Sequence, residues 1–156
     1  LILRSSWKTP ILSLYAIYSK PEGNYAVAPS IDINISTIYP PHFFRRYRER
    51  ILKDDSLSNE KIIKHYFAHD WGFMGTLVDK NFESIYHSFE EKDENDKVSF
   101  VATTAQGFCF GEKQGQINII KTIVSEDMLF EDQKATFRNL RKAFIAANKE
   151  RYKSDL

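Results

Sequence analysis

The segment from His42 to Arg50 carries the residues whose types and spacing best suit chemistry on a phosphate ester. It reads His-Phe-Phe-Arg-Arg-Tyr-Arg-Glu-Arg, and His42, Arg46 and Arg50 recur at steps of four. On a helix this spacing places the three side chains along one stripe. Arginine binds phosphate through two parallel hydrogen bonds, and histidine exchanges a proton near neutral pH. An amphipathic helix with a basic, solvated outer face is the alternative interpretation of the same pattern.

A second pair of histidines, His65 and His69, has the spacing of two zinc ligands on one helix face. Asp70 or His87 could complete a set of ligands. A zinc protease, however, needs glutamate directly after the first histidine, and Tyr66 stands there. We therefore interpret the two histidines as solvent-facing residues beside a buried aromatic face. The sequence predicts no metal and no cofactor.

Nucleophile signatures are missing from the chain. The single cysteine, Cys109, lies between Phe108 and Phe110 in an expected strand, which favours a buried, unreactive thiol. The sequence contains neither a Gly-x-Ser-x-Gly motif nor a glycine-rich phosphate loop before a helix.

Length and composition indicate one globular domain over residues 1–156, with 42% hydrophobic and 28% charged residues. The formal net charge of +1 argues against the large basic excess of many nucleic-acid-binding proteins. Basic residues nevertheless gather in 45–53 and 134–153, and acidic ones in 90–96. No apolar run approaches the ~18 residues that span a bilayer, so we expect no membrane partner. The cytoplasm is the expected location, and the oligomeric state stays open.

The elements that must position these residues follow from periodicity and turn signals. Ile31, Ile33 and Ile35 alternate with polar residues, which is the pattern of a strand with one wet face. Ser58 and Ser125 are the expected N-caps of two helices. Expected strands cover 11–18, 25–28, 31–38, 98–104, 108–110 and 116–124, and expected helices begin at residues 42, 59, 82 and 126. This order predicts an α+β fold with a mostly antiparallel sheet and helices packed on one face.

Several of these features together resemble a known superfamily. They are the His-x3-Arg-x3-Arg stripe followed by Ile51, the helix after Ser58, and a meander that ends in an aliphatic-Thr-aliphatic strand around Thr122. This order is similar to the barnase/EndoU/colicin/RelE-like superfamily of small α+β ribonucleases, found in toxins and in proteins of phages and mobile elements. The matching segments are 42–51, 58–67, 98–110 and 119–124.

The resemblance implies a cleft between the basic helix and the sheet, with His42, Arg46 and Thr122 as catalytic positions. His42 would act as general acid or base on a ribose 2′-hydroxyl or on the leaving oxygen. Arg46 and Arg50 would offset the charge that develops on the phosphorane, and Thr122 would donate a hydrogen bond to a non-bridging oxygen. Arg45 joins Arg50 as an expected phosphate-binding residue.

The function expected on these grounds is metal-independent cleavage of RNA, with RNA or a neutralising protein as partner. The alternative is a non-catalytic α+β module that binds a protein or another anionic partner through the basic helix. The two hypotheses differ in one structural expectation, which is whether His42, Arg46 and Thr122 converge on a shared cleft.

Overall fold

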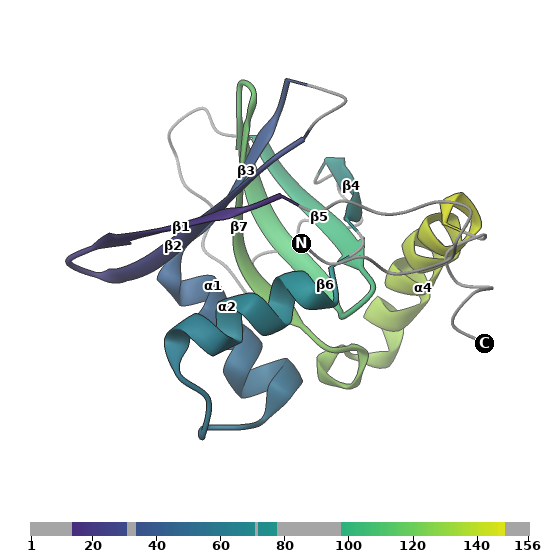
Figure 1. Cartoon of the computed structure of the whole chain (residues 1–156). Coiled ribbons are helices and arrows are strands. Elements are labelled where there is room, and N and C mark those ends of the chain that lie inside the picture. The colour runs from purple at the N-terminus through teal and green to yellow at the C-terminus, as the bar shows by residue number, and fades with distance from the viewer. Residues whose placement is uncertain (1–13, 31–33, 71, 78–97, 149–156) are drawn as a thin grey trace, which may run out of the picture.

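The computed structural model describes residues 14–30, 34–70, 72–77 and 98–148 (Figure 1). Seven strands form a single sheet in the order β1-β2-β3-β7-β6-β5-β4. Neighbouring strands are antiparallel except β3 and β7, which run parallel. The strands are β1 (Ala16–Lys20), β2 (Gly23–Pro29), β3 (Ser36–Tyr39), β4 (Phe73–Leu77), β5 (Val98–Thr104), β6 (Phe108–Gln114) and β7 (Ile117–Val124). The α+β class and the mostly antiparallel sheet are confirmed.

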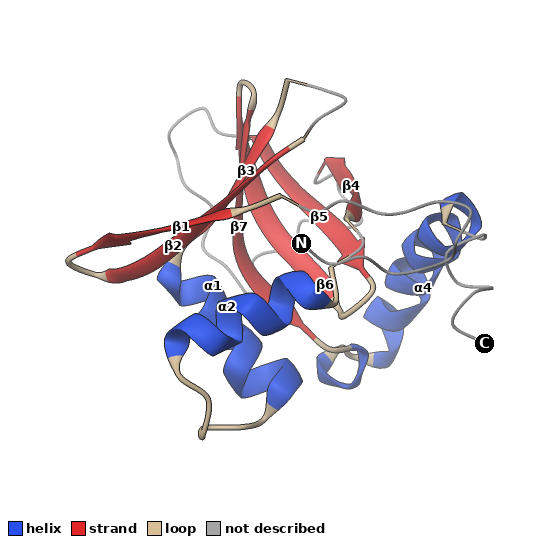
Figure 2. Cartoon of the chain, viewed as in Figure 1, coloured by secondary structure: helices blue, strands red, loops and turns tan. Residues whose placement is uncertain are grey.

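Three α-helices accompany the sheet among the described residues (Figure 2). They are α1 (Pro41–Tyr47), α2 (Asn59–Ala68) and α4 (Glu131–Ala147). A π-helical turn, Arg48–Leu52, continues α1, and a 3₁₀ turn, Glu126–Met128, precedes α4. The expected strand residues 11–13 and 31–33, the expected helix 82–89, the acidic segment 90–96 and the basic residues beyond 148 lie outside the described residues.

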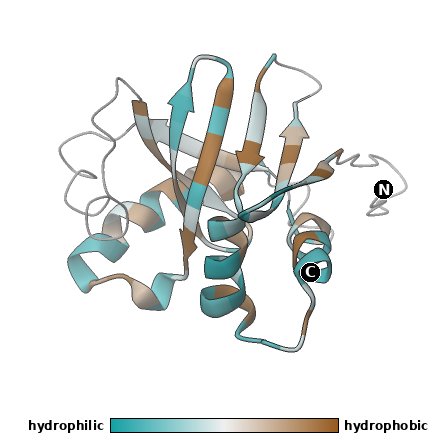
Figure 3. Cartoon of the chain, turned by 90° about the vertical axis from the view of Figure 1, so that its left-hand side faces the viewer, coloured by the Kyte–Doolittle hydropathy of each residue, from teal (hydrophilic) through white to brown (hydrophobic). Residues whose placement is uncertain are grey.

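Buried side chains on both faces of β5 and β6 determine where the helices pack. Phe100 and Cys109 belong to the core beneath α1 and α2, whereas Phe108 and Phe110 belong to a second core beneath α4. The expectation that helices share one face therefore holds for α1 and α2, but α4 covers the opposite face. Consecutive buried residues are typical of strands covered on both sides. Figure 3 shows hydrophobic and hydrophilic residues interleaved along the strands and helices.

Aromatic rings fill the core between the sheet and the first two helices. Phe43, Tyr47 and Phe67 are fully or almost fully buried, and Tyr66 meets the rings of both Phe43 and Tyr47 edge-on. Tyr39 brings β3 into the same cluster through contacts with Phe43 and Phe67. The aromatic residues that we expected on helix faces are therefore core residues here.

The predicted cap of α2 is confirmed, because the Ser58 hydroxyl accepts a hydrogen bond from the Lys61 amide at 3.4 Å. The predicted cap at Ser125 is wrong for α4: Ser125 precedes only the 3₁₀ turn, and α4 begins at Glu131. Leu129, which is buried in the core beneath α4, lies between the 3₁₀ turn and the start of α4. The Gln133 side chain then accepts a hydrogen bond from the Phe130 amide at 3.0 Å, which satisfies one amide at the start of the helix.

Strand β4 was not predicted, because Trp71-Gly-Phe-Met-Gly75 looked like the end of a helix. The segment pairs with β5 as the edge strand of the sheet, with Phe73 opposite Thr104. Two glycines in six residues are unfavourable signals for a strand. Pairing with β5 overrides them here.

Gly111 is the position at which the sheet tolerates a side chain least. A Cβ atom there would collide with the Ile119 carbonyl oxygen and would lie 2.8 Å from Cζ of Phe100. We expect Gly111→Ala to lower the free energy of unfolding by about 2–3 kcal/mol through overpacking, measured by urea denaturation. Gly75→Ala is the matched control, since its Cβ comes no closer than 3.3 Å to any neighbour. Equal stability of the two variants would contradict the prediction.

Candidate functional site

The π-helical turn after α1 sets the direction of Arg50. The Lys53 amide donates to the Arg48 carbonyl at 2.8 Å, and Lys53 ends the turn in the left-handed conformation with φ 53°. A π-helical turn holds more residues than an α-helical one, so Arg50 leaves the helix in a different direction from that of a continuous α-helix. Such turns are frequent at functional sites.

Arg50 reaches strand β7 and binds it at two points. Its Nη1 donates to Oγ1 of Thr122 at 3.0 Å and to the carbonyl oxygen of Ile123 at 3.2 Å. Strand β3 pairs only with residues 117–119 of β7. The later half of β7 is therefore open on the side where α1 packs, and Arg50 binds there.

The structure thus brings together two of the predicted site residues, one from the helix and one from the strand. The Thr122 side chain is fully buried, and its hydroxyl accepts from Arg50. The Thr122 hydroxyl is placed to hold the Arg50 guanidinium rather than to contact a ligand directly. Thr122 is accordingly a positioning residue for Arg50, which differs from the direct contact with phosphate oxygen that the resemblance implies.

The other predicted residues lie apart from Thr122 or have different partners. Arg46 forms an ion pair with Glu49 at 2.8 Å on the partly exposed outer side of α1. Arg45 is exposed and lines a cavity of about 290 Å³ between α1, α2 and the β1–β2 hairpin. His42 is half-buried in the first turn of α1, two turns before Arg50. Arg45 and Arg50, the two expected phosphate-binding residues, therefore have different surroundings.

An ion pair that the sequence analysis missed lies beside Thr122. Lys121 Nζ contacts Oε1 of Glu112, whose side chain is almost fully buried. Phe110 is opposite Thr122 in the sheet, so Glu112, two residues further along β6, shares the face of Thr122. We call Arg50, Thr122, Lys121 and Glu112 the β7 cluster.

The sequence pattern that could have revealed Glu112 is the alternation along β6, in which Phe108, Phe110 and Glu112 are every second residue. Strand alternation puts all three on one face, and a charged residue on a buried face needs a partner. Ser99, directly opposite Glu112 on β5, extends the polar surface across a third strand. The cluster combines a carboxylate, an ammonium and a guanidinium, which are the groups that proton transfer and phosphate binding require.

The histidine pair on α2 has a structural use in the chain. Tyr47 donates its hydroxyl proton to Oε1 of Gln106, so Nδ1 of His65, 2.9 Å away, donates to the Tyr47 oxygen. Gln106 in turn donates to the Tyr66 carbonyl at 3.0 Å. The rings of His65 and His69 stack at 4.4 Å. These bonds join α1 and α2 to the β5–β6 turn.

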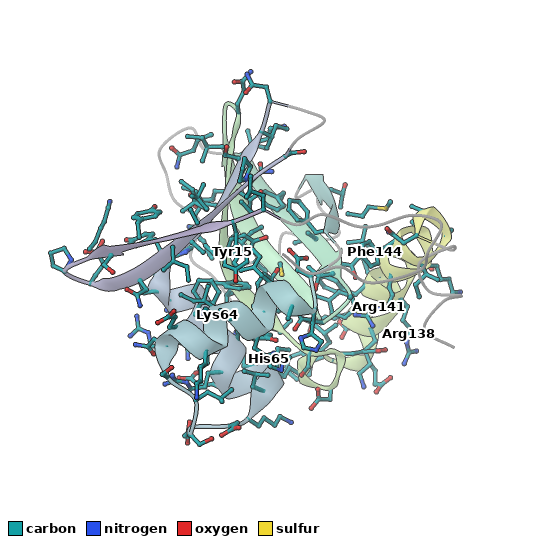
Figure 4. The ribbon with its side chains drawn as sticks, viewed as in Figure 1. Tyr15, Lys64, His65, Arg138, Arg141 and Phe144 are labelled. Carbon is teal, nitrogen blue, oxygen red and sulfur yellow. The ribbon has the colours of Figure 1, made fainter. Side chains whose placement is uncertain are left out.

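Arg141 of α4 holds the same turn from the other side of the sheet (Figure 4). It donates to the Thr104 carbonyl at 3.2 Å and lies over the Phe108 ring.

Burial, together with the neighbouring His69, lowers the pKa of His65. Within the described ranges, no group of three or more His, Cys, Asp or Glu side chains is arranged to hold a metal ion.

Asp70, considered above as a third ligand beside His65 and His69, has other contacts. Its Oδ1 accepts from the Gly72 amide at 2.9 Å, and its carboxylate lines a cavity on the sheet face that α1 and α2 also cover. Burial raises the pKa of Asp70 to about 6.

Comparison of the chain with protein-family models, with curated proteins and with solved structures finds no match. No helix in the described part of the chain is long and apolar enough to cross a membrane.

The buried ion pair predicts unequal effects of single and double substitutions. Lys121→Met leaves the Glu112 carboxylate buried without this counter-ion, and we expect a loss of about 2 kcal/mol in the free energy of unfolding. Adding Glu112→Gln should recover part of that loss. Chemical denaturation of both single variants and the double variant measures the coupling. Strict additivity would show that the two side chains do not stabilise each other.

The raised pKa of Asp70 predicts that substituting this residue increases the stability of the protein in a pH-dependent way. A carboxylate whose pKa is raised on folding stabilises the fold only while protonated, so its favourable contribution is lost as the pH rises through about 6. Asp70→Asn should therefore stabilise the protein by about 2–3 kcal/mol near pH 7.5 and by much less near about pH 4. Urea denaturation at both pH values tests this. Asp55→Asn, at an exposed loop position, is the control and should show no such gain.

Proposed function

We propose that the protein is a metal-independent ribonuclease that cleaves RNA at the β7 cluster and the adjoining face of α1. The observation that carries the proposal is the anchoring of Arg50. Its guanidinium is fixed on Thr122 and Ile123 by bonds between residues more than 70 positions apart in the chain. A cation that is held in place before the substrate arrives stabilises developing negative charge without further reorganisation.

The described residues supply the groups that such a reaction needs. His42 is the proposed general acid or base, because it lies on α1 before Arg46 and Arg50 and an imidazole ring can both accept and donate a proton. Glu112 is the second acid-base group, and Lys121 adds a positive charge beside it. The 2′-hydroxyl of the ribose would be the nucleophile, so the reaction requires neither a metal nor a protein nucleophile.

The arginine contacts favour this function over a docking helix. Arg48 donates to the Leu57 carbonyl and to Asn59, which ties α1 to the start of α2. With Arg46 paired to Glu49 and Arg50 bound to β7, three of the four arginines in 41–52 have partners within the fold. Arg45 is the exception in that segment. A single exposed arginine is a small basis for recognising an anionic partner.

The test is cleavage of labelled single-stranded RNA by the purified chain in the presence of EDTA. We expect products that end in a 2′,3′-cyclic phosphate, and no cleavage of a substrate with 2′-deoxyribose at the scissile position. His42→Ala should lower kcat by at least about 100-fold. His69→Ala is the matched control, because His69 is an exposed histidine outside the proposed site.

The positioning role of Thr122 is tested in the same assay. Thr122→Val removes the acceptor for Arg50 and should lower kcat with little change in KM, whereas Thr122→Ser keeps the hydroxyl and should retain activity. The proposal fails if RNA stays intact, if EDTA stops the cleavage, or if His42→Ala cleaves as fast as the unmodified chain.

A further inference from the structure

A cavity among the described residues lies on the sheet face opposite Thr122, Lys121 and Glu112. Its volume is about 680 Å³, within the range of pockets that hold small molecules. Its floor is the sheet from β2 to β4, where Ala28 and Gly75 present little or no side chain to the cavity. Aromatic side chains of Tyr39, Phe73 and Phe100 form much of its apolar wall.

One end of this cavity carries the Asp70 carboxylate, which has no ion-pair partner among the described residues. Asp70 follows the end of α2 and is partly buried, and its side-chain hydrogen bond comes from the Gly72 amide. No lysine, arginine or histidine of the described residues forms an ion pair with it. A buried carboxylate without a counter-ion lowers stability, and such residues are concentrated at binding and catalytic sites.

The cation among the lining residues, Lys113, lies too far along the sheet to neutralise Asp70. Phe73, close to Asp70, is opposite Thr104 in the sheet, whereas Lys113 is opposite Val98. The six residue steps along β5 from Val98 to Thr104 correspond to on the order of 20 Å. Lys113 is also exposed to solvent. The two ends of the cavity therefore have different electrostatic character.

We infer that this cavity binds a small organic amine, with its ammonium group on the Asp70 carboxylate and its apolar body along Tyr39, Phe73 and Phe100. A carboxylate supplies the opposite charge, and aromatic rings attract a cation through their faces. The apolar wall suits an aryl or alkyl chain rather than a free inorganic cation, which would need several oxygen ligands. This site is separate from the proposed ribonuclease site, since its lining residues include none of His42, Arg50, Thr122, Lys121 and Glu112.

The experiment is isothermal titration calorimetry of the whole chain near neutral pH with three probes of similar shape. They are 2-phenylethylamine, 2-phenylethanol and phenylacetate, which carry a positive charge, no charge and a negative charge. We expect the amine to bind at least about tenfold more tightly than either of the others. Asp70→Asn should lower the affinity for the amine by about tenfold or more and leave binding of the alcohol unchanged.

Two further variants separate loss of the site from loss of the fold. Asp55→Asn makes the same chemical change at an exposed loop position and should bind the amine normally. Ala28→Phe fills the cavity from β2 and should abolish binding of the amine while thermal unfolding stays cooperative. The inference is overturned if the amine does not bind, if it binds no better than phenylacetate or phenylethanol, or if Asp70→Asn retains its affinity. RNA cleavage is scored separately, so either site can fail without the other.

Discussion

The aromatic cluster around Tyr66 is the interaction on which the rest of the structure depends. Its ring contacts those of five other aromatic residues: Tyr39, Phe43, Phe44, Tyr47 and Phe67. Most of these pairs are edge-on or tilted, the arrangements that ring quadrupoles favour, and each contributes about 0.5–1.5 kcal/mol beyond its buried area. The cluster joins α1, α2 and β3 into one unit. The position of α1 determines where Arg50 meets β7, and the end of α2 determines where Asp70 lies.

The shortness of β3 has an equally direct consequence for the proposed site. Parallel pairing with β7 ends at Ile119, so among the described strands none lies beside the second half of β7 on that side. Helix α1 packs there instead. An arginine can pass this open edge and reach the Thr122 side chain, which belongs to the face covered by α4. If β3 were longer by a few residues, it would separate Arg50 from Thr122.

The sequence predicted those parts of the fold that depend on local patterns. Ser58, the meander from Val98 to Val124 and the buried faces of the helices all follow from caps, turns and periodicity. The resemblance implied that His42, Arg46 and Thr122 share a cleft, whereas the contact that the structure shows for Thr122 is with Arg50. The π-helical turn and strand β4 were not predicted, because each depends on contacts with residues distant in the chain. Glu112 and Lys121 were missed for a related reason, since charged residues in a strand usually mark its solvent-exposed face.

Glu112 and Asp70 lie on opposite faces of the sheet and differ in their charged neighbours. The net charge of +1 does not reveal this local difference. Glu112 has a counter-ion in Lys121, and Arg50 is bound on the neighbouring strand. Asp70 has an amide hydrogen bond and no ion pair in the described chain. Burial of a charge without compensation costs free energy, and groups perturbed in this way are concentrated at functional sites. We propose an anionic ligand beside Arg50 and Lys121, and a cationic ligand on the face that carries Asp70. A single sheet can serve both because its strands alternate their side chains between two separate environments.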